Sequence, residues 1–189
     1  MVTQGDVYEN PRTGTRVEIR ELTGEHVGFE RRYPPGTGRA DAHLHLDFTQ
    51  RWEVASGTVT AAVDGEARRL GPSESVELPI GTKHQDPFNE TSSEAIVRWQ
   101  IKPVTPFIDA FMNTYASLLV SDELNEQDEF PMLQLFVILS ATRAQSYAAN
   151  LPVALQRATL PLLGAIGRLR GYKVRYGESA GRPIRPVAP

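Results

Sequence analysis

Cysteine is missing from this chain of 189 residues. Disulfides, thiolate metal ligands and cysteine nucleophiles are therefore excluded, and any bound metal must use nitrogen and oxygen ligands. Histidine is scarce, with four residues in the whole chain. Three of these four belong to one arrangement, so the composition directs attention to a single region of the sequence.

Long basic runs and long apolar runs are missing as well. The net charge is -3, and no long basic run or recognisable nucleic-acid-reading motif is present, which argues against nucleic acid as a partner. No apolar run reaches the length of a membrane span, and the first residues contain neither the basic nor the apolar segment of an export signal. We therefore expect a cytoplasmic protein.

From about residue 15 to residue 102 the chain consists of short stretches with strand character, separated by Gly, Pro and Asp-Gly. Asp64-Gly65 is a strong hairpin signal, because both central positions of the favoured turn need positive φ. The segment 34–38 must form a loop, since neither of its prolines can donate a ladder hydrogen bond. The pattern is typical of an all-β sandwich or barrel. The expected strands are 15–20, 26–33, 42–46, 50–56, 58–63, 67–70, 75–78 and 94–101.

After the last expected strand the apolar spacing becomes helical. It predicts helices over about 105–119 and 131–149, and a third from Pro152 that Pro161 must kink or end. The third segment carries arginines without acids, yet an apolar helical face is more often buried against its own barrel or a second subunit than laid on a membrane. We therefore expect a homodimer without membrane association, and a disordered tail over 177–189.

The histidines of the single arrangement are His43, His45 and His84. His43 and His45 are two residues apart on an expected strand, and strand side chains at that spacing point to the same face. Two imidazoles can therefore converge on one ion, and a third from a neighbouring strand can complete the ligand set. The spacing indicates a metal site. His26 lies apart from these residues and is interpreted as a surface or strand histidine.

These residues resemble the two motifs of the cupin superfamily. The residues that match are, for the first motif, Gly38, His43, His45, Gln50 and Gly57 and, for the second, Gly71, Pro79, Gly81, His84 and Asn89. The resemblance implies a mainly β fold: a cupin double-stranded β-helix (jelly-roll barrel) over 1–104, followed by an α-helical extension over 105–176 that packs on the barrel or forms a dimer interface. It also implies a bound divalent transition metal (Fe, Ni, Mn or Zn) and a small-molecule substrate that enters the open mouth of the barrel.

Gln50 stands where the family carries a glutamate. A glutamine keeps an amide oxygen but loses the charge that partly neutralises a divalent ion. The site is then three histidines with a weak amide ligand, three histidines with additional water, or a degenerate site. Asp47 is the second candidate for the oxygen ligand because it would face inward on a regular strand, and Glu53, which should face outward, is a distant third.

If Gln50 points inward, Trp52 and Val54 do so too and form a wall of the substrate pocket, with Asp47 and Trp99 as further candidates. Trp99 lies on one of the two faces of the last expected strand, and the sequence does not decide which face is internal. Core packing is favoured over ligand contact for both tryptophans, because aromatic residues dominate ordinary cores.

We expect a metal-dependent enzyme that acts on a small organic molecule inside the barrel, as an oxygenase (an oxidoreductase), isomerase, cyclase or lyase. The ion would polarise a carbonyl or enolate oxygen, or activate dioxygen if it is iron. Two alternatives stay open: a non-catalytic binding or sensing module with a degenerate metal site, which Gln50 favours, and an interaction protein that dimerises through its helices. The fold does not choose among the reactions, and no catalytic residue is assigned.

Overall fold

The computed structural model of the protein describes residues 2–38 and 41–176, so the expected disorder of 177–189 concerns residues outside this part. In chain order the elements are β1 (Val7–Glu9), β2 (Arg16–Leu22), β3 (Val27–Tyr33), β4 (His43–His45), β5 (Thr49–Ser56), β6 (Val59–Val63), β7 (Glu66–Leu70), β8 (Ser75–Leu78), β9 (His84–Phe88), β10 (Ala95–Lys102), α1 (Pro106–Val120), α2 (Met132–Thr142), β11 (Ser146–Ala148) and α3 (Val153–Leu169).

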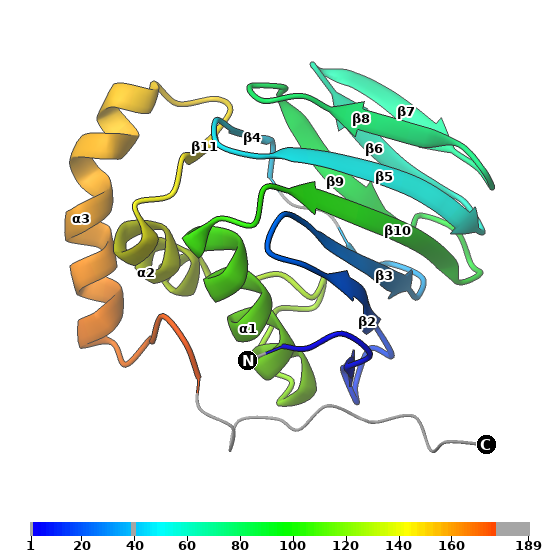
Figure 1. The fold of residues 1–189 in the computed structure, drawn as a ribbon, viewed down its shortest axis with the longest axis horizontal. Helices are drawn as coiled ribbons and strands as arrows, with labels where there is room; N and C mark the ends of the chain where they lie inside the picture. Colours follow the sequence, from blue (N-terminus) through cyan, green and yellow to red (C-terminus); the bar gives the residue numbers. More distant parts are fainter. Residues whose placement is uncertain (1, 39–40, 177–189) are drawn as a thin grey trace.

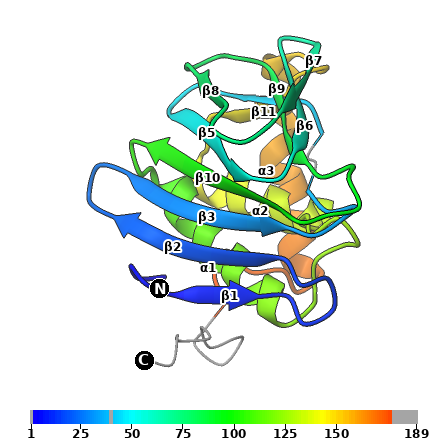
Figure 2. The same ribbon diagram turned by 90° about the vertical axis from the view of Figure 1, so that its right-hand side faces the viewer.

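The described strands form two antiparallel sheets. Sheet A has the order β1-β2-β3-β10-β5-β8, and sheet B has the order β11-β4-β9-β6-β7. Strands β10, β3 and β2 run side by side at the front of Figure 2, with the three helices behind them, and Figure 1 shows α2 and α3 on the left and strands β5 to β10 on the right. The expected mainly β fold, with two antiparallel sheets and helices after them, is confirmed.

The inner face of sheet A is built by alternation along three neighbouring strands. Its ladder places two cross-strand rows next to each other, Phe29–Trp99–Trp52 and Arg31–Val97–Val54. The buried face of β10, which the sequence left undecided, consists of Ala95, Val97, Trp99 and Ile101. Burying an apolar side chain of this size stabilises the fold by about 1.5–3 kcal/mol, so the rows fix the register of these strands.

The turns form where their chemistry predicts them. Asp64 and Gly65 have φ values of 50° and 86° in the β6–β7 hairpin, as expected. Gly57, between β5 and β6, has a φ of +74°, and a Cβ at this position would lie 2.6 Å from the main-chain oxygen of Glu94. Glycine is therefore required at this position of the first cupin-like motif for its backbone conformation and its lack of a side chain.

Three strands were not predicted from the sequence, namely β1, β9 and β11. Strands β1 and β11 have three residues each, which is too short for a periodic signal. Strand β9 contains Pro87, which cannot donate a ladder hydrogen bond, and its pairing with β6 is irregular between Thr60 and Ala62. His84, the histidine of the second cupin-like motif, therefore lies on a strand that the local sequence does not predict.

Helix α1 begins where the sequence predicts. The hydroxyl of Thr105 accepts a hydrogen bond from the main-chain N–H of Ile108 at 3.2 Å, and Pro106 occupies a first-turn position where its missing N–H does no harm. Buried residues of α1, including Phe107 and Tyr115, belong to the same hydrophobic cluster as the inner face of sheet A. The helices and the sheets thus share one core, and the division of the chain into domains stays a prediction.

The second helix is shorter than predicted. It ends at Thr142, and Arg143 has a left-handed conformation with a φ of 52°. Instead of continuing to about Ala149, the chain forms β11, where Ser146 is paired with His45 of β4. The prediction was wrong because helical periodicity does not register the unpaired main-chain groups that an edge strand such as β4 offers to a passing segment.

Pro161 does not end the third helix, because α3 continues across it. Pro161 is exposed, so water can reach the carbonyl oxygen that loses its helical donor. Further along, Gly164 and Gly167 allow α3 to lie close against α2, and a Cβ on Gly167 would be 2.5 Å from Val137 Cγ2. Packing between the two helices therefore outweighs the local cost of the proline.

An apolar stripe on α3 is exposed, formed by Leu155, Leu162 and Leu169. No helix in residues 2–38 and 41–176 is long and apolar enough to cross a membrane. The expectation that a second subunit covers helical surface of this kind, as in a homodimer, stays a prediction.

Candidate metal centre

The three histidines of the cupin-like motifs come together on sheet B. His43 and His45 lie on β4, and His84 on β9 is paired with His43 in the antiparallel ladder. One possible ligand atom from each side chain lies within 4.8 Å of the other two. His45 and His84 are buried and His43 is half-buried. The imidazoles are therefore close enough to share one ion.

Main-chain carbonyl groups hold two of the rings in a single tautomer. His43 Nδ1 lies 2.7 Å from the carbonyl oxygen of Asp41, and His84 Nδ1 lies 2.9 Å from the carbonyl oxygen of Thr82. A carbonyl oxygen only accepts hydrogen bonds, so each Nδ1 carries the proton and donates it. The neutral ring then presents a lone pair at Nε2, which is the form that binds a metal.

The third ring, His45, is held by the helical extension. Its Nδ1 lies 2.9 Å from the Ser146 hydroxyl on β11, which can accept the Nδ1 proton in the same way. Phe48 stacks on a face of the ring, with centroids 4.1 Å apart. Sequence reasoning missed Ser146 because it placed this residue inside a helix, and only the β11–β4 pairing brings it to the histidine.

The buried rings are neutral near pH 7. Burial lowers the pKa of His45 well below its ordinary value, and nearby His43 and His84 lower it further. Burial, followed by His43, also lowers the pKa of His84, against the opposing effect of Asp86. A metal would not have to displace a proton from these two rings.

Gln50 extends from β5 to the histidines. It is buried, its Nε2 is 3.4 Å from His45 Nε2, and its Oε1 has no hydrogen-bond partner among the described residues. A half-turn of the amide would exchange these two atoms and bring the oxygen next to the Nε2 position. Gln50 is therefore placed to offer an amide oxygen to an ion that the histidines hold.

The other two oxygen candidates lie elsewhere. Strand β4 ends at His45, so the regular strand that would have turned Asp47 inward is not formed. Burial raises the pKa of the Asp47 carboxyl, and the main chain of Gln145 beside it has the opposite effect. Glu53 faces outward, 2.9 Å from Arg51. In the described part of the chain neither acid joins the histidines in a group of possible ligands within 4.8 Å.

Asp86 is an acidic neighbour of the site that sequence reasoning missed. Its Oδ1 lies 3.8 Å from His84 Nε2 and 3.9 Å from His43 Nε2, and no described residue hydrogen-bonds to it. A negative charge thus lies beside the nitrogens that would face an ion. The spacing of two between His84 and Asp86 is the same signal that pointed to His43 and His45, but it needs β9 to be recognised as a strand.

The candidate pocket residues lie at different distances from the histidines. Trp52 is fully buried, and its ring centroid is 5.7 Å from that of His84. Trp99 lies on the next strand, with ring centroids 5.5 Å from Trp52 and 5.5 Å from Phe29. Val54 is buried in the neighbouring row. Trp52 therefore borders the cluster, whereas Trp99 and Val54 continue the same wall away from it.

These donors fit a divalent transition ion. Three imidazole nitrogens, one amide oxygen and one carboxylate match the preference of such ions for nitrogen and oxygen ligands. The Nε2 atom of His84 is buried and has no hydrogen-bond partner among the described residues, which is unfavourable unless an ion or a ligand meets it. With three protein nitrogens as ligands, coordination positions would stay open for a substrate.

Part of the chain is similar to proteins of known sequence and structure. No family model matches the chain. Two curated proteins, mannose-1-phosphate guanylyltransferase of Escherichia coli K12 and ManC, the enzyme of that name from Salmonella typhimurium LT2, are each 27% identical over 77 residues, which is 41% of this chain. The match spans 14% of the length of those enzymes.

Several solved structures each align with about half of the chain. KdgF from Halomonas sp. has a TM-score of 0.45 and 22% identity, over 51% of this chain and 86% of that one. An RmlC-like cupin from Shewanella frigidimarina has a TM-score of 0.44 and 18% identity, over 51% and 83%. A sugar phosphate isomerase from a cupin superfamily, from Silicibacter pomeroyi, has a TM-score of 0.44 and 20% identity, over 49% and 61%.

Proposed function

We propose that this protein is a metal-dependent enzyme that acts on a small organic molecule bound between its two sheets. His43, His45 and His84 would hold one divalent ion (Fe, Ni, Mn or Zn) through Nε2, with Gln50 and Asp86 beside it. The observation that carries the proposal is the oxygen partner at all three Nδ1 atoms, which directs the Nε2 lone pairs of one cluster to a common ion.

A bound ion would act as a Lewis acid on a carbonyl or enolate oxygen, or would activate dioxygen if it is iron. Asp86 Oδ1 would accept a proton from a substrate carbon or hydroxyl beside the histidines and return it to a neighbouring atom. Trp52 and Phe48 would exclude water from two sides, which strengthens electrostatic interactions in the site. A carboxylate there suits isomerase, cyclase or lyase chemistry, whereas oxygenase chemistry, that of an oxidoreductase, depends more on the metal.

A phosphorylated sugar is one candidate substrate. The two curated relatives are named for mannose 1-phosphate, and their matching region covers 41% of this chain. Because it is 14% of those enzymes, the guanylyltransferase activity is not part of the proposal.

The second candidate function is a non-catalytic binding or sensing module. The observation that favours it is Gln50, which brings an uncharged amide to the position next to His45 Nε2. Such a protein would bind its small molecule without converting it. Mass spectrometry of molecules that co-purify with the protein, followed by incubation of each with the metal-loaded protein, separates the two functions. A product that appears with turnover supports the enzyme, and binding without product in every metal form supports the sensor.

The metal part of the proposal is tested by elemental analysis of protein purified without added metal, and by titration with Fe(II), Ni(II), Mn(II) and Zn(II). We expect His45→Ala and His84→Ala to weaken binding by about a hundredfold or more, since loss of an outer hydrogen bond alone costs about 10–100-fold. The control is His26→Ala, because His26 lies beside Glu21 at 2.9 Å, outside the cluster. Equal affinities of the wild type and His84→Ala would contradict metal binding at this site.

A further inference from the structure

Arg31 places a permanent positive charge on the inner face of sheet A. In the ladder it is paired with Val97, which is paired with Val54, so the guanidinium lies in a row of short apolar side chains. The neighbouring row contains Trp99 and Trp52, and Trp52 borders the histidine cluster. Charged side chains are rarely placed on a buried sheet face unless a partner meets them.

No described residue satisfies the donors of Arg31. Its Nε and Nη2 atoms are buried and make no hydrogen bond in the part of the chain that the structure describes. Instead, the guanidinium carbon lies 4.4 Å from the ring centroid of Tyr33 and 5.5 Å from that of Tyr115. Aromatic faces stabilise the charge but accept no N–H hydrogen bond in the plane of the guanidinium. Nε and Nη2 form one edge of the group, which is the edge that grips an oxyanion with two parallel bonds.

Other buried polar groups on the residues around Arg31 also lack hydrogen-bond partners. The hydroxyls of Tyr33 and Tyr115 and the indole N–H groups of Trp52 and Trp99 are buried without a hydrogen-bond partner among the described residues. Tyr115 belongs to α1, so the helical extension completes the group. A tyrosine hydroxyl can donate, and an indole N–H can only donate. A molecule that satisfies these groups must therefore bring acceptor oxygens.

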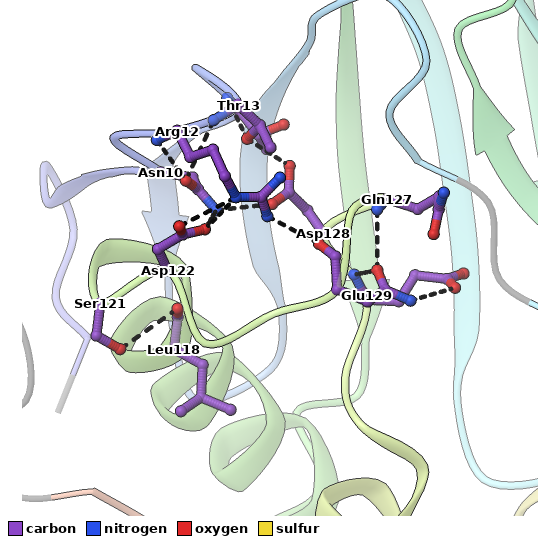
Figure 3. A network of polar contacts seen from close by, with 11 residues as sticks. Asn10, Arg12, Thr13, Leu118, Ser121, Asp122, Gln127, Asp128 and Glu129 are labelled. Carbon is purple, nitrogen blue, oxygen red and sulfur yellow. Dashed lines mark hydrogen bonds and ion pairs between the residues drawn. The ribbon is translucent and has the colours of Figure 1, made fainter.

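Two nearby acids do not hydrogen-bond to Arg31. Asp128 accepts hydrogen bonds from Asn10 at 2.8 Å and from Thr13 at 2.7 Å, in the network that joins the α1–α2 loop to the β1–β2 loop (Figure 3). Asp86 Oδ1 lies 3.8 Å from His84 Nε2 and makes no hydrogen bond with any described residue. Neither acid hydrogen-bonds to Arg31 Nε or Nη2.

Glu129 is the third acid in the region. Burial raises the pKa of its carboxyl to about 6, with Asp41 and Asp86 adding to the effect and Asn125 and Arg31 opposing it. Its Oε2 is 3.4 Å from the amide nitrogen of Asn125. The charge of Arg31 favours the Glu129 carboxylate, but burial outweighs it, and Glu129 Oε1 accepts no hydrogen bond from Arg31 or any other described residue.

We propose that Arg31, together with the hydroxyls of Tyr33 and Tyr115, binds an oxyanion of the small molecule, a carboxylate or a phosphate group. The inference deepens the proposed function and rests on it for one point, that the other end of this molecule faces the histidines. The anion site itself needs no metal. Because the unpaired donors reject a neutral group of the same shape, the site selects acids and phosphate esters.

The test uses the full chain and three probes, propionate, propionamide and inorganic phosphate, at constant ionic strength. The chain has two tryptophans, so the indole N–H signals of Trp52 and Trp99 in nitrogen-15 NMR spectra report on the wall next to Arg31. We expect propionate, phosphate or both to shift these signals with saturation, and propionamide not to do so. Binding of propionamide as tight as that of propionate would overturn the proposal.

Variants assign the effect to Arg31. Arg31→Gln should raise the Kd of the bound oxyanion by about tenfold or more, and Arg31→Lys by less, because a lysine keeps the charge without the fork. The matched control is Arg32→Gln, since Arg32 is next in the strand and pairs with Glu94 at 3.3 Å. An unchanged Kd in Arg31→Gln would overturn the proposal. If that variant does not fold, Arg31→Lys and Tyr115→Phe take its place, and an unchanged Kd in both overturns it.

Metal-free protein, Zn(II)-loaded protein and the His45→Ala variant separate this inference from the proposed function. Arg31-dependent anion binding in a protein that fails to bind any metal would refute the metal centre and support the anion site. Metal binding with no Arg31-dependent anion binding would leave the metal centre intact and overturn the anion site. Saturation by phosphate alone or by propionate alone supports the site in either case and identifies which oxyanion it takes.

Discussion

The two sheets differ in the chemistry that they present on their inner faces. Sheet B presents acceptors, because the Nε2 atoms of its histidines carry lone pairs and Asp86 adds a carboxylate. Sheet A presents donors on Arg31, Trp52 and Trp99 that no described residue accepts. Gln50 of sheet A reaches the histidines of sheet B, and Trp52 borders them. The difference indicates a ligand with two unlike ends, one that meets a metal and one that is anionic.

The helical extension contributes to both faces. Ser146 of β11 contacts His45 on sheet B, and Tyr115 of α1 lies over Arg31 on sheet A. The extension therefore supports the site twice, through β11 at the edge of sheet B and through α1 against sheet A. Variants that alter one face, or its support, should change one end of the ligand site and leave the other end intact.

Asp86→Asn should break the acceptor face of sheet B most strongly. The substitution removes a negative charge close to the ion position, and a unit pair near 4 Å is worth about 4 kcal/mol at an effective dielectric constant of about 20. That energy corresponds to about a thousandfold in affinity, but Asp86 is partly exposed to water, so we expect metal affinity to fall by about a hundredfold, measured by competition with a chelator of known affinity. Glu53→Gln, which removes an outward-facing acid, is the control. Equal affinities for wild type and Asp86→Asn would show that the carboxylate does not act on the ion.

Gln50→Glu should sharpen the comparison, because it adds a carboxylate on sheet A that lies beside the histidines of sheet B. A carboxylate gains Coulomb energy beside a divalent ion, and each ~1.4 kcal/mol corresponds to about tenfold in affinity. Metal affinity should rise by about tenfold or more, while turnover should fall because a more neutral centre is a weaker Lewis acid. Gln85→Glu is the control, because it adds the same charge on β9 at a position whose side chain points to the face opposite His84. Coincident affinities for Fe(II), Ni(II) and Zn(II) would place Gln50 away from the metal.

Ser146→Ala tests the support that the helical extension gives to sheet B. Without its hydroxyl, His45 loses the group that holds its Nδ1 proton, and loss of such an outer hydrogen bond weakens metal binding by about 10–100-fold. We expect the lower end of that range, because His43 and His84 keep their carbonyl partners. Ser121→Ala at the end of α1 serves as control. If Ser146→Ala has wild-type metal affinity and unchanged thermal stability, β11 does not contribute to the metal site.

The smallest effect concerns the pH dependence of folding in metal-free protein. Burial lowers the pKa values of His45 and His84 from the ordinary 6.5, so these rings bind protons more readily in the unfolded chain. The free energy of unfolding should be highest above pH 6.5 and decrease as the pH falls through the folded pKa values. Denaturant unfolding between pH 8 and pH 5 measures it. His45→Gln should flatten the profile, and an identical profile in that variant would contradict the assignment.

Local sequence determined the parts of the site that depend on near neighbours. Alternation along a strand placed His43 and His45 on one face, and the same rule turned Gln50 and Trp52 inward. The Asp64-Gly65 turn and the start of α1 were likewise correct, because turn and cap geometry depend on a few adjacent residues. The match to the cupin motifs then indicated that His84 would lie near the pair.

Tertiary structure alone decided the parts that depend on residues far apart in the chain. The β11–β4 pairing, which ends α2 early and brings Ser146 to His45, uses unpaired main-chain groups that no periodicity reports. In the sequence Arg31 looks like an ordinary strand residue, and only the structure shows that its donors are buried where β3 packs beside β10 and Tyr115 of α1. Asp86 could be recognised as a neighbour of the histidines only once the structure showed that β9, which contains a proline, pairs with β4 and β6. Sequence patterns report a residue's own element, whereas burial, ladder partners and unpaired donors come from the elements that pack against it.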